Sequence, residues 1–407
     1  MKMLNVFEEL ILPNETRIKN RFLKSAMSEI MANRQNQPTD LHNKLYQAWA
    51  EGGSGIVVTG NVMVDRNALG EPGNVVIEDE RDLDRLKQWA EAGSKNNTQL
   101  WMQINHPGRQ SPRSLSKEPV APSAIPLSNY SKQLFSKPRA LTTEEVKELV
   151  ERYIKTAQIA KKAGFKGVQI HGAHGYLVSQ FLSSQANQRN DEYGGSLENR
   201  MRFLVEIYTG MRKMLGPDFP ISIKMNATDF NHGGFSEEES LQVALKLADL
   251  GIDLIEISGG NYENPKMFKE TEEGKEEIFF INYAEKLKNL IDVPVVVTGG
   301  FRSLKSMEEA LLQNKTSMIG LARPLALIPD LPDQMFKGEL TRMDTPRLTT
   351  GSKFLDKKVG SLVGISYYEQ QMLRIAKGKE VKQHRNAWCP LLYTLKSHGL
   401  NGLLPRR

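Results

Sequence analysis

The sequence predicts a (β/α)8 TIM barrel with long loops after strands 3 and 4 and a C-terminal extension. Three observations support this fold class. A unit of amphipathic helix, glycine and short apolar run recurs along the chain, eight such runs can be recognised, and no G-x-G-x-x-G pattern follows the first of them. Helices that alternate with apolar strands indicate a parallel sheet. The count of eight favours a closed barrel over a doubly wound open sheet, which is the competing fold.

The repeating unit is clearest around Gly164, Gly167 and Gly251, which separate a helical pattern from an apolar run. A glycine after a helix suits the left-handed cap position, and a short apolar run suits a strand that is buried on both faces. Thr142-x-x-Glu145 and Ser236-x-x-Glu239 are capping boxes that mark two helix starts. The predicted strands are residues 22–27, 56–60, 99–104, 167–171, 221–226, 253–258, 294–298 and 317–321.

Two long loop insertions, here called excursions, are added to this barrel. Residues 106–139 contain six prolines and few periodic apolar positions, and residues 172–196 form a second long loop. Both follow the carboxyl ends of strands, where barrels build their active sites. Beyond residue 336 the period is lost, although residues 362–375 can form a helix. We therefore expect a barrel over residues 1–336 and a C-terminal extension over 337–407, packed on the barrel or trailing from it.

The composition indicates a soluble globular protein, with 407 residues, 39% hydrophobic and 25% charged. No apolar run approaches the length of about 18 residues that a membrane span needs. Glu8 and Glu9 interrupt the opening segment where a signal peptide is apolar. We expect a cytoplasmic protein with no membrane partner. The single cysteine, Cys389, excludes an internal disulfide and an iron–sulfur cluster, which needs about four thiolates.

The net charge of +6 is concentrated at the C-terminus, where residues 374–407 hold eight basic residues against one acid. Such a tail can attract a phosphate-bearing reductant or nucleic acid, and it can equally be a solvated end of the chain. No aromatic-interleaved basic patch or nucleic-acid-binding module accompanies it. We therefore predict no nucleic-acid partner.

Three protic side chains, His171, His174 and Tyr176, follow the fourth predicted strand. Two imidazoles that donate to one substrate oxygen stabilise developing negative charge there. A phenol, with an ordinary pKa of about 10, stays protonated at neutral pH and can act as a general acid. The alternatives are a metal site, two structural histidines and a core tyrosine. No third ligand follows at suitable spacing before Asp191, so we predict no metal.

A phosphate site is indicated at the ends of the last two predicted strands, which carry Gly299-Gly300 and Ala322-Arg323. Glycines let backbone amides approach a phosphate, an arginine pairs with it, and barrels often bind phosphate at these two loops. Gly-Gly alone indicates only a turn. Its placement after strand 7 strengthens the interpretation.

Longer motifs carry a resemblance. With His171-x-x-His174-x-Tyr176, the string NQRNDEYGGSLENRMRF at 187–203, Lys19-Asn-Arg-Phe and His106-Pro-Gly-Arg, the chain resembles the old yellow enzyme family of FMN-dependent ene-reductases (NADH:flavin oxidoreductases) over residues 5–336. The resemblance implies a TIM barrel that binds FMN non-covalently at the carboxyl ends of its strands. It also implies a ping-pong cycle in which hydride from NADH or NADPH is stored on the flavin and passed to the β-carbon of a small activated alkene.

The resemblance assigns roles residue by residue. His171 and His174 would bind the carbonyl or nitro oxygen of the substrate, and Tyr176 would deliver a proton to the α-carbon. Lys224 would lie near N1 of the flavin, where a cation stabilises the anionic reduced form. The residues implied to contact FMN or its phosphate are Ser25, Ala26, Met27, Ser28, Gly60, Gln103, His171, Lys224, Gly299, Gly300, Ala322 and Arg323.

Two alternative functions would also involve a bound flavin. One is an FMN-dependent amine dehydrogenase or demethylase, against which the lone cysteine and Tyr176 argue. The other is a flavin-binding sensor or scaffold with vestigial catalysis, which the three intact protic side chains disfavour. NADH and NADPH stay alternatives as the reductant, several activated alkenes stay alternatives as the substrate, and a homo-oligomer is compatible with the sequence.

Overall fold

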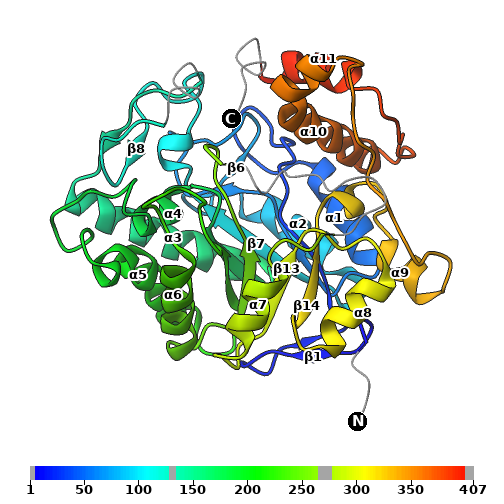
Figure 1. Ribbon diagram of the computed structural model, residues 1–407, viewed down its shortest axis with the longest axis horizontal. Helices are drawn as coiled ribbons and strands as arrows, with labels where there is room; N and C mark the ends of the chain where they lie inside the picture. Colours follow the sequence, from blue (N-terminus) through cyan, green and yellow to red (C-terminus); the bar gives the residue numbers. More distant parts are fainter. Residues whose placement is uncertain (1–4, 128–133, 265–276, 399–407) are drawn as a thin grey trace.

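The computed structural model, which describes residues 5–127, 134–264 and 277–398, contains a closed barrel of eight parallel strands (Figure 1). Each barrel strand pairs with the next barrel strand along the chain, and the ring closes where β14 pairs with β3. The predicted fold class is therefore confirmed. The barrel strands are β3 (Phe22–Lys24), β4 (Ile56–Val58), β7 (Gln99–Asn105), β10 (Gly167–Gly172), β11 (Ile221–Asn226), β12 (Leu254–Ser258), β13 (Val295–Thr298) and β14 (Met318–Leu321).

All eight predicted strands are present, but β3 and β4 end earlier than predicted. In both, the backbone makes one further bond and then leaves the barrel wall. The Ser25 amide donates to the Leu321 carbonyl at 2.8 Å, and the Thr59 amide donates to the Trp101 carbonyl at 2.9 Å. Ala26 to Ser28 after β3, and Gly60 after β4, therefore lie outside the named strands, and these are positions that we expect at the site.

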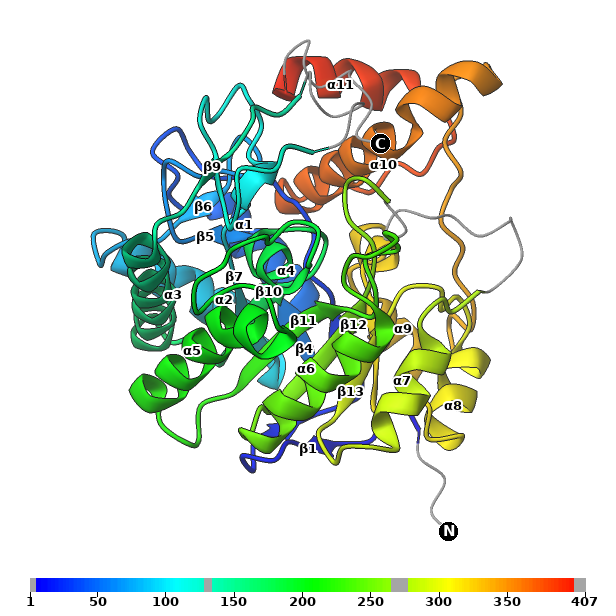
Figure 2. The same ribbon diagram turned by 60° about the vertical axis from the view of Figure 1, so that its left-hand side comes forward.

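A ring of helices encloses the barrel (Figures 1 and 2). Both predicted capping boxes are present, because Thr142 and Ser236 accept hydrogen bonds from the amides of Glu145 and Glu239 at 3.2 Å. Gly164 ends its helix with a φ of 96°, in the left-handed region that glycine favours. The helices of the ring are α1 (Asp40–Glu51), α2 (Leu83–Gly93), α3 (Thr143–Ala163), α5 (Leu197–Leu215), α6 (Glu237–Asp249), α7 (Ile281–Lys288), α8 (Leu304–Leu312) and α9 (Leu331–Phe336).

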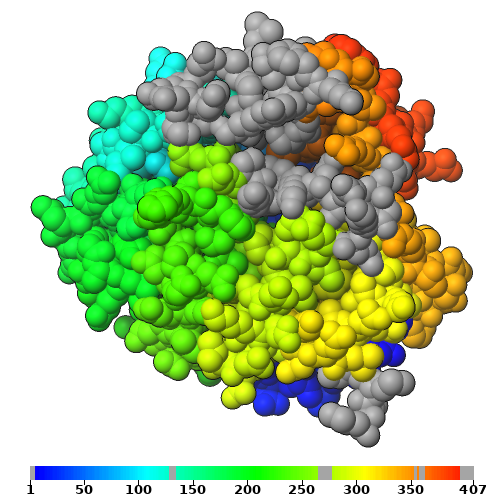
Figure 3. All heavy atoms as spheres, in the orientation of Figure 1, coloured from blue at the N-terminus to red at the C-terminus, as the bar shows by residue number. Residues whose placement is uncertain are grey.

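An antiparallel hairpin of β1 (Leu10–Ile11) and β2 (Arg17–Ile18) covers the amino-terminal end of the barrel. Its Leu12 and Ile18 are buried in one apolar cluster with Leu23 and Trp101 of the barrel interior. The hairpin lies at the bottom of Figure 1, and part of the same amino-terminal segment is visible in blue at the lower edge of Figure 3. This end of the barrel is therefore a packed floor.

The opposite rim carries the two predicted excursions. The first holds η2 (Gly108–Gln110) and a short pair, β8 (Val120–Ala121) with β9 (Arg139–Ala140), and its residues 128–133 lie outside the described part. The second holds α4 (Leu177–Leu182). Further short elements are β5 (Val62–Met63), which extends the sheet beside β7, β6 (Val75–Val76) and η1 (Lys95–Asn97).

The C-terminal extension contributes α10 (Lys353–Ala376) and α11 (Trp388–His398), so the predicted helix over 362–375 is confirmed and longer than predicted. α10 packs against α1 and against η5 (Arg323–Ala326), at the carboxyl-terminal rim (Figure 2). The described part of the extension is thus packed on the barrel. Over the described residues, no helix is both long enough and apolar enough to cross a bilayer.

The tight fit of the barrel interior gives a test at Gly167. A Cβ added there would lie 2.7 Å from the buried indole of Trp101, so Gly167→Ala should lower the free energy of unfolding by about 1–3 kcal/mol through overpacking. Urea unfolding followed by circular dichroism measures the effect. Gly364 of α10 has open space at its Cβ, and Gly364→Ala is the control that should leave stability unchanged or raised.

Candidate active site

The barrel interior changes from apolar to polar along its strands. The apolar floor includes Leu23, Trp101, Leu254 and Val296. Two residues further along the same strands, on the same inward face, the side chains are polar. This polar layer consists of Ser25, Gln103, Gln169, Lys224, Glu256 and Thr298.

Glu256 lies at the centre of the polar layer. Lys224 Nζ lies 3.0 Å from Glu256 Oε1, and the Thr298 hydroxyl donates to the same oxygen at 2.7 Å. The Ser25 hydroxyl also donates to Oε1, and Gln169 donates to Oε2 at 2.8 Å. Burial alone would raise the pKa of Glu256, but Lys224 and these hydrogen bonds outweigh it and lower the pKa. Glu256 is therefore a buried anion that fixes the position of Lys224.

The two predicted histidines lie above this layer with their ring centroids 5.1 Å apart. His171 belongs to β10, and its Nδ1 accepts the amide hydrogen of Ala173 at 3.3 Å. His174 has a φ of 61°, in the left-handed region, and its amide donates to Asn226 Oδ1 at 3.1 Å. Its Nε2 lies 2.7 Å from the hydroxyl oxygen of Ser258. The turn after β10 thus brings the two imidazoles together.

Burial lowers the pKa of His171 well below its usual value, with smaller contributions from His174 and Lys224. Burial first, and Lys224 second, lower the pKa of His174 in the same way. Both imidazoles are therefore neutral at neutral pH. A neutral His171 whose Nδ1 accepts a hydrogen bond carries its proton on Nε2, so it remains a donor.

Tyr176 adjoins the histidines, because its ring centroid lies 4.8 Å from that of His171. Its hydroxyl oxygen lies 2.8 Å from that of Tyr262, a residue that sequence reasoning missed. Both tyrosines are buried, with leucine and phenylalanine side chains of the first excursion packed around them. The structure therefore brings all three predicted protic groups together and adds a second phenol.

The residues after β3 and β4 form a second buried network outside the barrel wall. The Gly60 amide donates to Tyr46 Oη at 2.9 Å and to Glu29 Oε1 at 3.2 Å. Lys24 Nζ lies 3.9 Å from Glu29 Oε1 and 3.9 Å from the ring centroid of Trp49. Burial lowers the pKa of Lys24 to about 8 against the opposing attraction of Glu29. The Gly60 amide is thus occupied, and a Cβ added to Gly60 would lie 2.6 Å from the Met27 carbonyl oxygen, so the predicted contact of Gly60 with the flavin stays a prediction.

Ser28 lies between the barrel and the C-terminal extension. Its hydroxyl donates to Glu71, in the loop before β6, and lies 3.2 Å from Glu369 Oε1 of α10. Glu369 is fully buried. The extension therefore reaches a residue that the sequence analysis placed at the flavin, a contact that no sequence pattern indicated.

The predicted phosphate positions lie at the ends of the neighbouring strands β13 and β14. Gly299 and Gly300 have φ values of 98° and 95°, which non-glycine residues rarely adopt. A Cβ on Gly299 would meet open space, whereas one on Gly300 would lie 2.2 Å from the Glu277 carbonyl oxygen. Arg323 begins η5, two residues after the end of β14. The backbone therefore leaves open space next to Gly299. The same rim of the barrel also carries a cationic side chain, Arg323.

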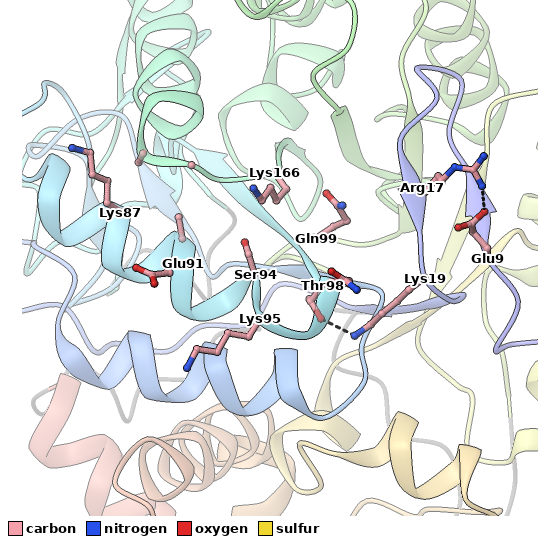
Figure 4. Close-up of a pocket in the computed structure, with 14 residues that line it drawn as sticks. Glu9, Arg17, Lys19, Lys87, Glu91, Ser94, Lys95, Thr98, Gln99 and Lys166 are labelled. Atoms are coloured by element: carbon pink, nitrogen blue, oxygen red, sulfur yellow. Dashed lines mark hydrogen bonds and ion pairs between the residues drawn. The ribbon is translucent and has the colours of Figure 1, made fainter.

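A separate cavity of about 810 Å³ lies at the amino-terminal end of the barrel (Figure 4). Gln99 at the start of β7 and Lys166 before β10 line it, together with Lys19, which donates to the Asn96 carbonyl at 2.6 Å and to Thr98 Oγ1 at 3.0 Å. Because these residues precede the strands, the cavity lies at the opposite end from His171. It is no part of the reacting centre.

The family model described as the NADH:flavin oxidoreductase / NADH oxidase family matches residues 5–341. The chain belongs to this family. Its relatives are FMN-dependent enzymes of the old yellow enzyme type, and the predicted cofactor, FMN, is confirmed at the level of the family.

Individual relatives are similar over most of this chain. The NADH-dependent flavin oxidoreductase iccE of Talaromyces variabilis is 36% identical over 360 residues, which cover 81% of this chain and 86% of the relative. The cinnamate reductase of Clostridium sporogenes is 33% identical over 353 residues, covering 80% of this chain. The chain spans about half the length of that reductase (52%) and of the NADH-dependent flavin oxidoreductase iliE of Neonectria sp. (48%).

Among solved structures, the old yellow enzyme homologue from Zymomonas mobilis matches with a TM-score of 0.71 and 25% identity. The match covers 84% of this chain and 95% of that one. The overall fold is thus shared with this old yellow enzyme homologue.

The residues at the barrel mouth fit FMN. The open space beside Gly299 and the cationic Arg323, which follow the paired strands β13 and β14, suit a phosphate, and the buried Lys224 provides a fixed cation inside the mouth. Ser25 and Gln103 are engaged in the polar layer, with Gln103 donating to Gln169 at 2.8 Å. Their predicted contacts with the flavin, like those of Ala26, Met27 and Ala322, stay predictions. Among the described residues, no cluster of three or more histidine, cysteine or acidic side chains could hold a metal.

The central role of Glu256 can be tested by Glu256→Gln. Removing one partner of a buried ion pair should lower the free energy of unfolding by about 3–5 kcal/mol at pH 7. Because the folded-state pKa of Glu256 is lowered, its contribution is present above the unfolded pKa of about 4.3 and is lost as pH falls through the folded value. The variant should therefore lose stability at pH 7 and show a weaker acid dependence.

Chemical denaturation at several pH values measures this effect. Glu309→Gln is the control, because Glu309 makes only an exposed pair with Lys305 at 3.8 Å, worth less than about 1 kcal/mol. Equal stability of the Glu256→Gln and Glu309→Gln proteins would contradict the central role of Glu256.

Proposed function

We propose that the protein takes hydride from NADH or NADPH and reduces the C=C bond of α,β-unsaturated carbonyl or nitro compounds. One observation carries the proposal: two neutral imidazoles and a phenol converge at the carboxyl end of β10, with ring centroids 4.8 and 5.1 Å apart. These are the groups that a conjugate reduction needs, namely hydrogen-bond donors for the carbonyl or nitro oxygen of the substrate and a proton donor for its α-carbon.

The histidines would hold the substrate oxygen. As hydride reaches the β-carbon, negative charge moves through the conjugated system to the carbonyl or nitro oxygen. His171 offers Nε2–H to that oxygen, because its Nδ1 already accepts the amide hydrogen of Ala173. His174 is held by Asn226 through its backbone amide and by Ser258 through Nε2, so Nδ1 is the ring nitrogen that would donate to the substrate oxygen. Removal of one preorganised donor of this kind costs about 3–4 kcal/mol of transition-state stabilisation.

Tyr176 would complete the reduction by giving its phenolic proton to the α-carbon. One hydride and one proton then add across the double bond, which balances the reaction. With FMN bound, the hydride comes from a nicotinamide through the flavin. The buried aromatic and aliphatic side chains around Tyr176 limit the access of water to its hydroxyl.

The names of relatives support the substrate class. A cinnamate reductase acts on a C=C bond conjugated to a carboxyl group, and other relatives are named NADH-dependent flavin oxidoreductases. We therefore propose an activated alkene as substrate and NADH as the first nucleotide to test. The test is anaerobic: NADH should bleach the flavin absorbance of the purified protein, and cyclohexenone should restore it. A flavin that NADH reduces but that no activated alkene reoxidises would contradict the proposal.

The role of Tyr176 as the proton donor can be tested with the variant Tyr176→Phe. Flavin reduction by NADH should keep its rate, because that step uses no proton from Tyr176, whereas alkene-dependent reoxidation should slow by about 10²–10⁴-fold. Stopped-flow absorbance separates the two half-reactions. Alkene reduction at the unaltered rate would remove Tyr176 from the mechanism.

The histidines give a pH test. Since the pKa of each is lowered well below its ordinary value, neither gains a proton on acidification from about pH 8 to pH 6. The dissociation constant of cyclohexenone, measured from the shift of the oxidised flavin spectrum, should therefore stay constant over this range. Tighter binding below about pH 6.5 would indicate that an imidazole becomes charged, contrary to this expectation.

A further inference from the structure

We propose that Tyr262 is a positioning residue for Tyr176: it orients the hydroxyl of Tyr176 and stabilises the phenolate that remains after proton delivery. This inference rests on the proposed function, since it assumes that Tyr176 is the acid. Its geometric basis is the distance of 2.8 Å between the two hydroxyl oxygens, within a buried site.

The loop that carries Tyr262 is tied to the turn that carries His174. The side chain of Asn226 accepts the His174 amide at 3.1 Å and donates to the Gly260 carbonyl at 2.9 Å. His174 and Asn261 also form an isolated parallel bridge. The loop is closed on itself as well, because Asn261 Oδ1 accepts the amides of Glu263 and Asn264 at 2.9 and 2.8 Å. Tyr262 is therefore held in a fixed place relative to the catalytic turn.

Aromatic packing fixes the ring of Tyr262 from two sides. Its centroid lies 5.9 Å from that of Tyr176 and 6.1 Å from that of Phe135. Leu127 and Leu134 belong to the same apolar cluster. A hydrogen bond between two hydroxyls in such surroundings is stronger than in water, because little solvent competes for either group.

The chemistry follows from the proton balance. When Tyr176 gives its proton to the α-carbon, its oxygen becomes an anion, and the O–H of Tyr262 can donate to it. A hydrogen bond to an ionised acceptor is shorter and stronger than one between neutral groups. The bond is thus strongest in the state that follows proton delivery, which favours the transfer. A proton from water then restores Tyr176.

Two other polar groups among the described residues are His171 and Glu263. The imidazole of His171 faces Tyr176 and is neutral, as its lowered pKa requires. Next to Tyr262 in sequence, Glu263 pairs with Arg109 of η2 at 3.1 Å, so its charge is balanced by a cation. The hydroxyl of Tyr262 lies within hydrogen-bonding distance of that of Tyr176, and we therefore expect it to influence the acidity of Tyr176 directly.

Tyr262→Phe tests the inference, because it keeps the ring and removes only the hydroxyl. Flavin reduction by NADH should be unchanged, and alkene reduction should slow by about tenfold, as expected for one hydrogen bond to a charged group. The alkaline limb of the pH profile of the alkene step should move to higher pH, since the phenolate of Tyr176 loses its donor. Tyr208→Phe removes a buried hydroxyl that bonds the Leu250 carbonyl, outside the site, and should change neither step.

A readout without turnover comes from nuclear magnetic resonance of protein labelled with ¹³C at the tyrosine ζ carbon. The resonance of Tyr176, assigned by its loss in Tyr176→Phe, should titrate at higher pH in Tyr262→Phe than in the unaltered protein. A packing role alone would leave this titration and the pH profile in place. An unchanged titration together with an unchanged alkene rate would overturn the inference.

The two hypotheses fail in different ways. Full alkene turnover by Tyr176→Phe would end the proposed function. A slow Tyr176→Phe enzyme beside a Tyr262→Phe enzyme with the ordinary rate and pH profile would end the inference about Tyr262 alone. If both residues act through one proton, the double variant should be no slower than Tyr176→Phe.

Discussion

The buried carboxylate of Glu256 is the constraint on which the barrel mouth depends. Removing a charge from water is expensive, and a buried anion persists only where partners supply the lost interactions. Here the partners come from β10, β11 and β13 and from the residue after β3, so one carboxylate joins four parts of the barrel wall. Lys224 is consequently held in one place. The histidines and tyrosines are assembled directly above this rigid layer.

Much of the barrel could be predicted because its signals are local. Apolar runs, glycine caps and capping boxes each depend on neighbours in sequence, and the strand runs were found within a few residues. It was harder to predict which side chains of a strand point into the barrel and which point outward. Lys24 and Ser25 are adjacent, yet Lys24 lies against Trp49 outside the wall and Ser25 bonds Glu256 inside it. Glu256 is a charged residue within the apolar run Leu254–Ser258, and this sequence signal could have identified it.

The contacts that the sequence could not predict are those between distant loops. Tyr176 and Tyr262 are 86 residues apart, and Ser28 and Glu369 are 341 residues apart. No spacing rule connects such pairs, because each depends on how two rim segments meet after the barrel has closed. The contact of Glu369 also changes the interpretation of the extension. A buried carboxylate from α10 places the extension beside Ser28, a residue predicted to contact FMN.

The charge on Lys224 has a consequence beyond its ion pair. Burial is the larger cause of the lowered pKa values of His171 and His174, and the repulsion from Lys224 adds to it. A cation near the cofactor site therefore helps to keep both imidazoles neutral. Neutral donors bind a neutral carbonyl without placing further positive charge beside Lys224. In the proposed reaction, the proton for the α-carbon would then come from a group that is protonated at neutral pH by its own chemistry, and among the protic groups gathered here a phenol meets that condition.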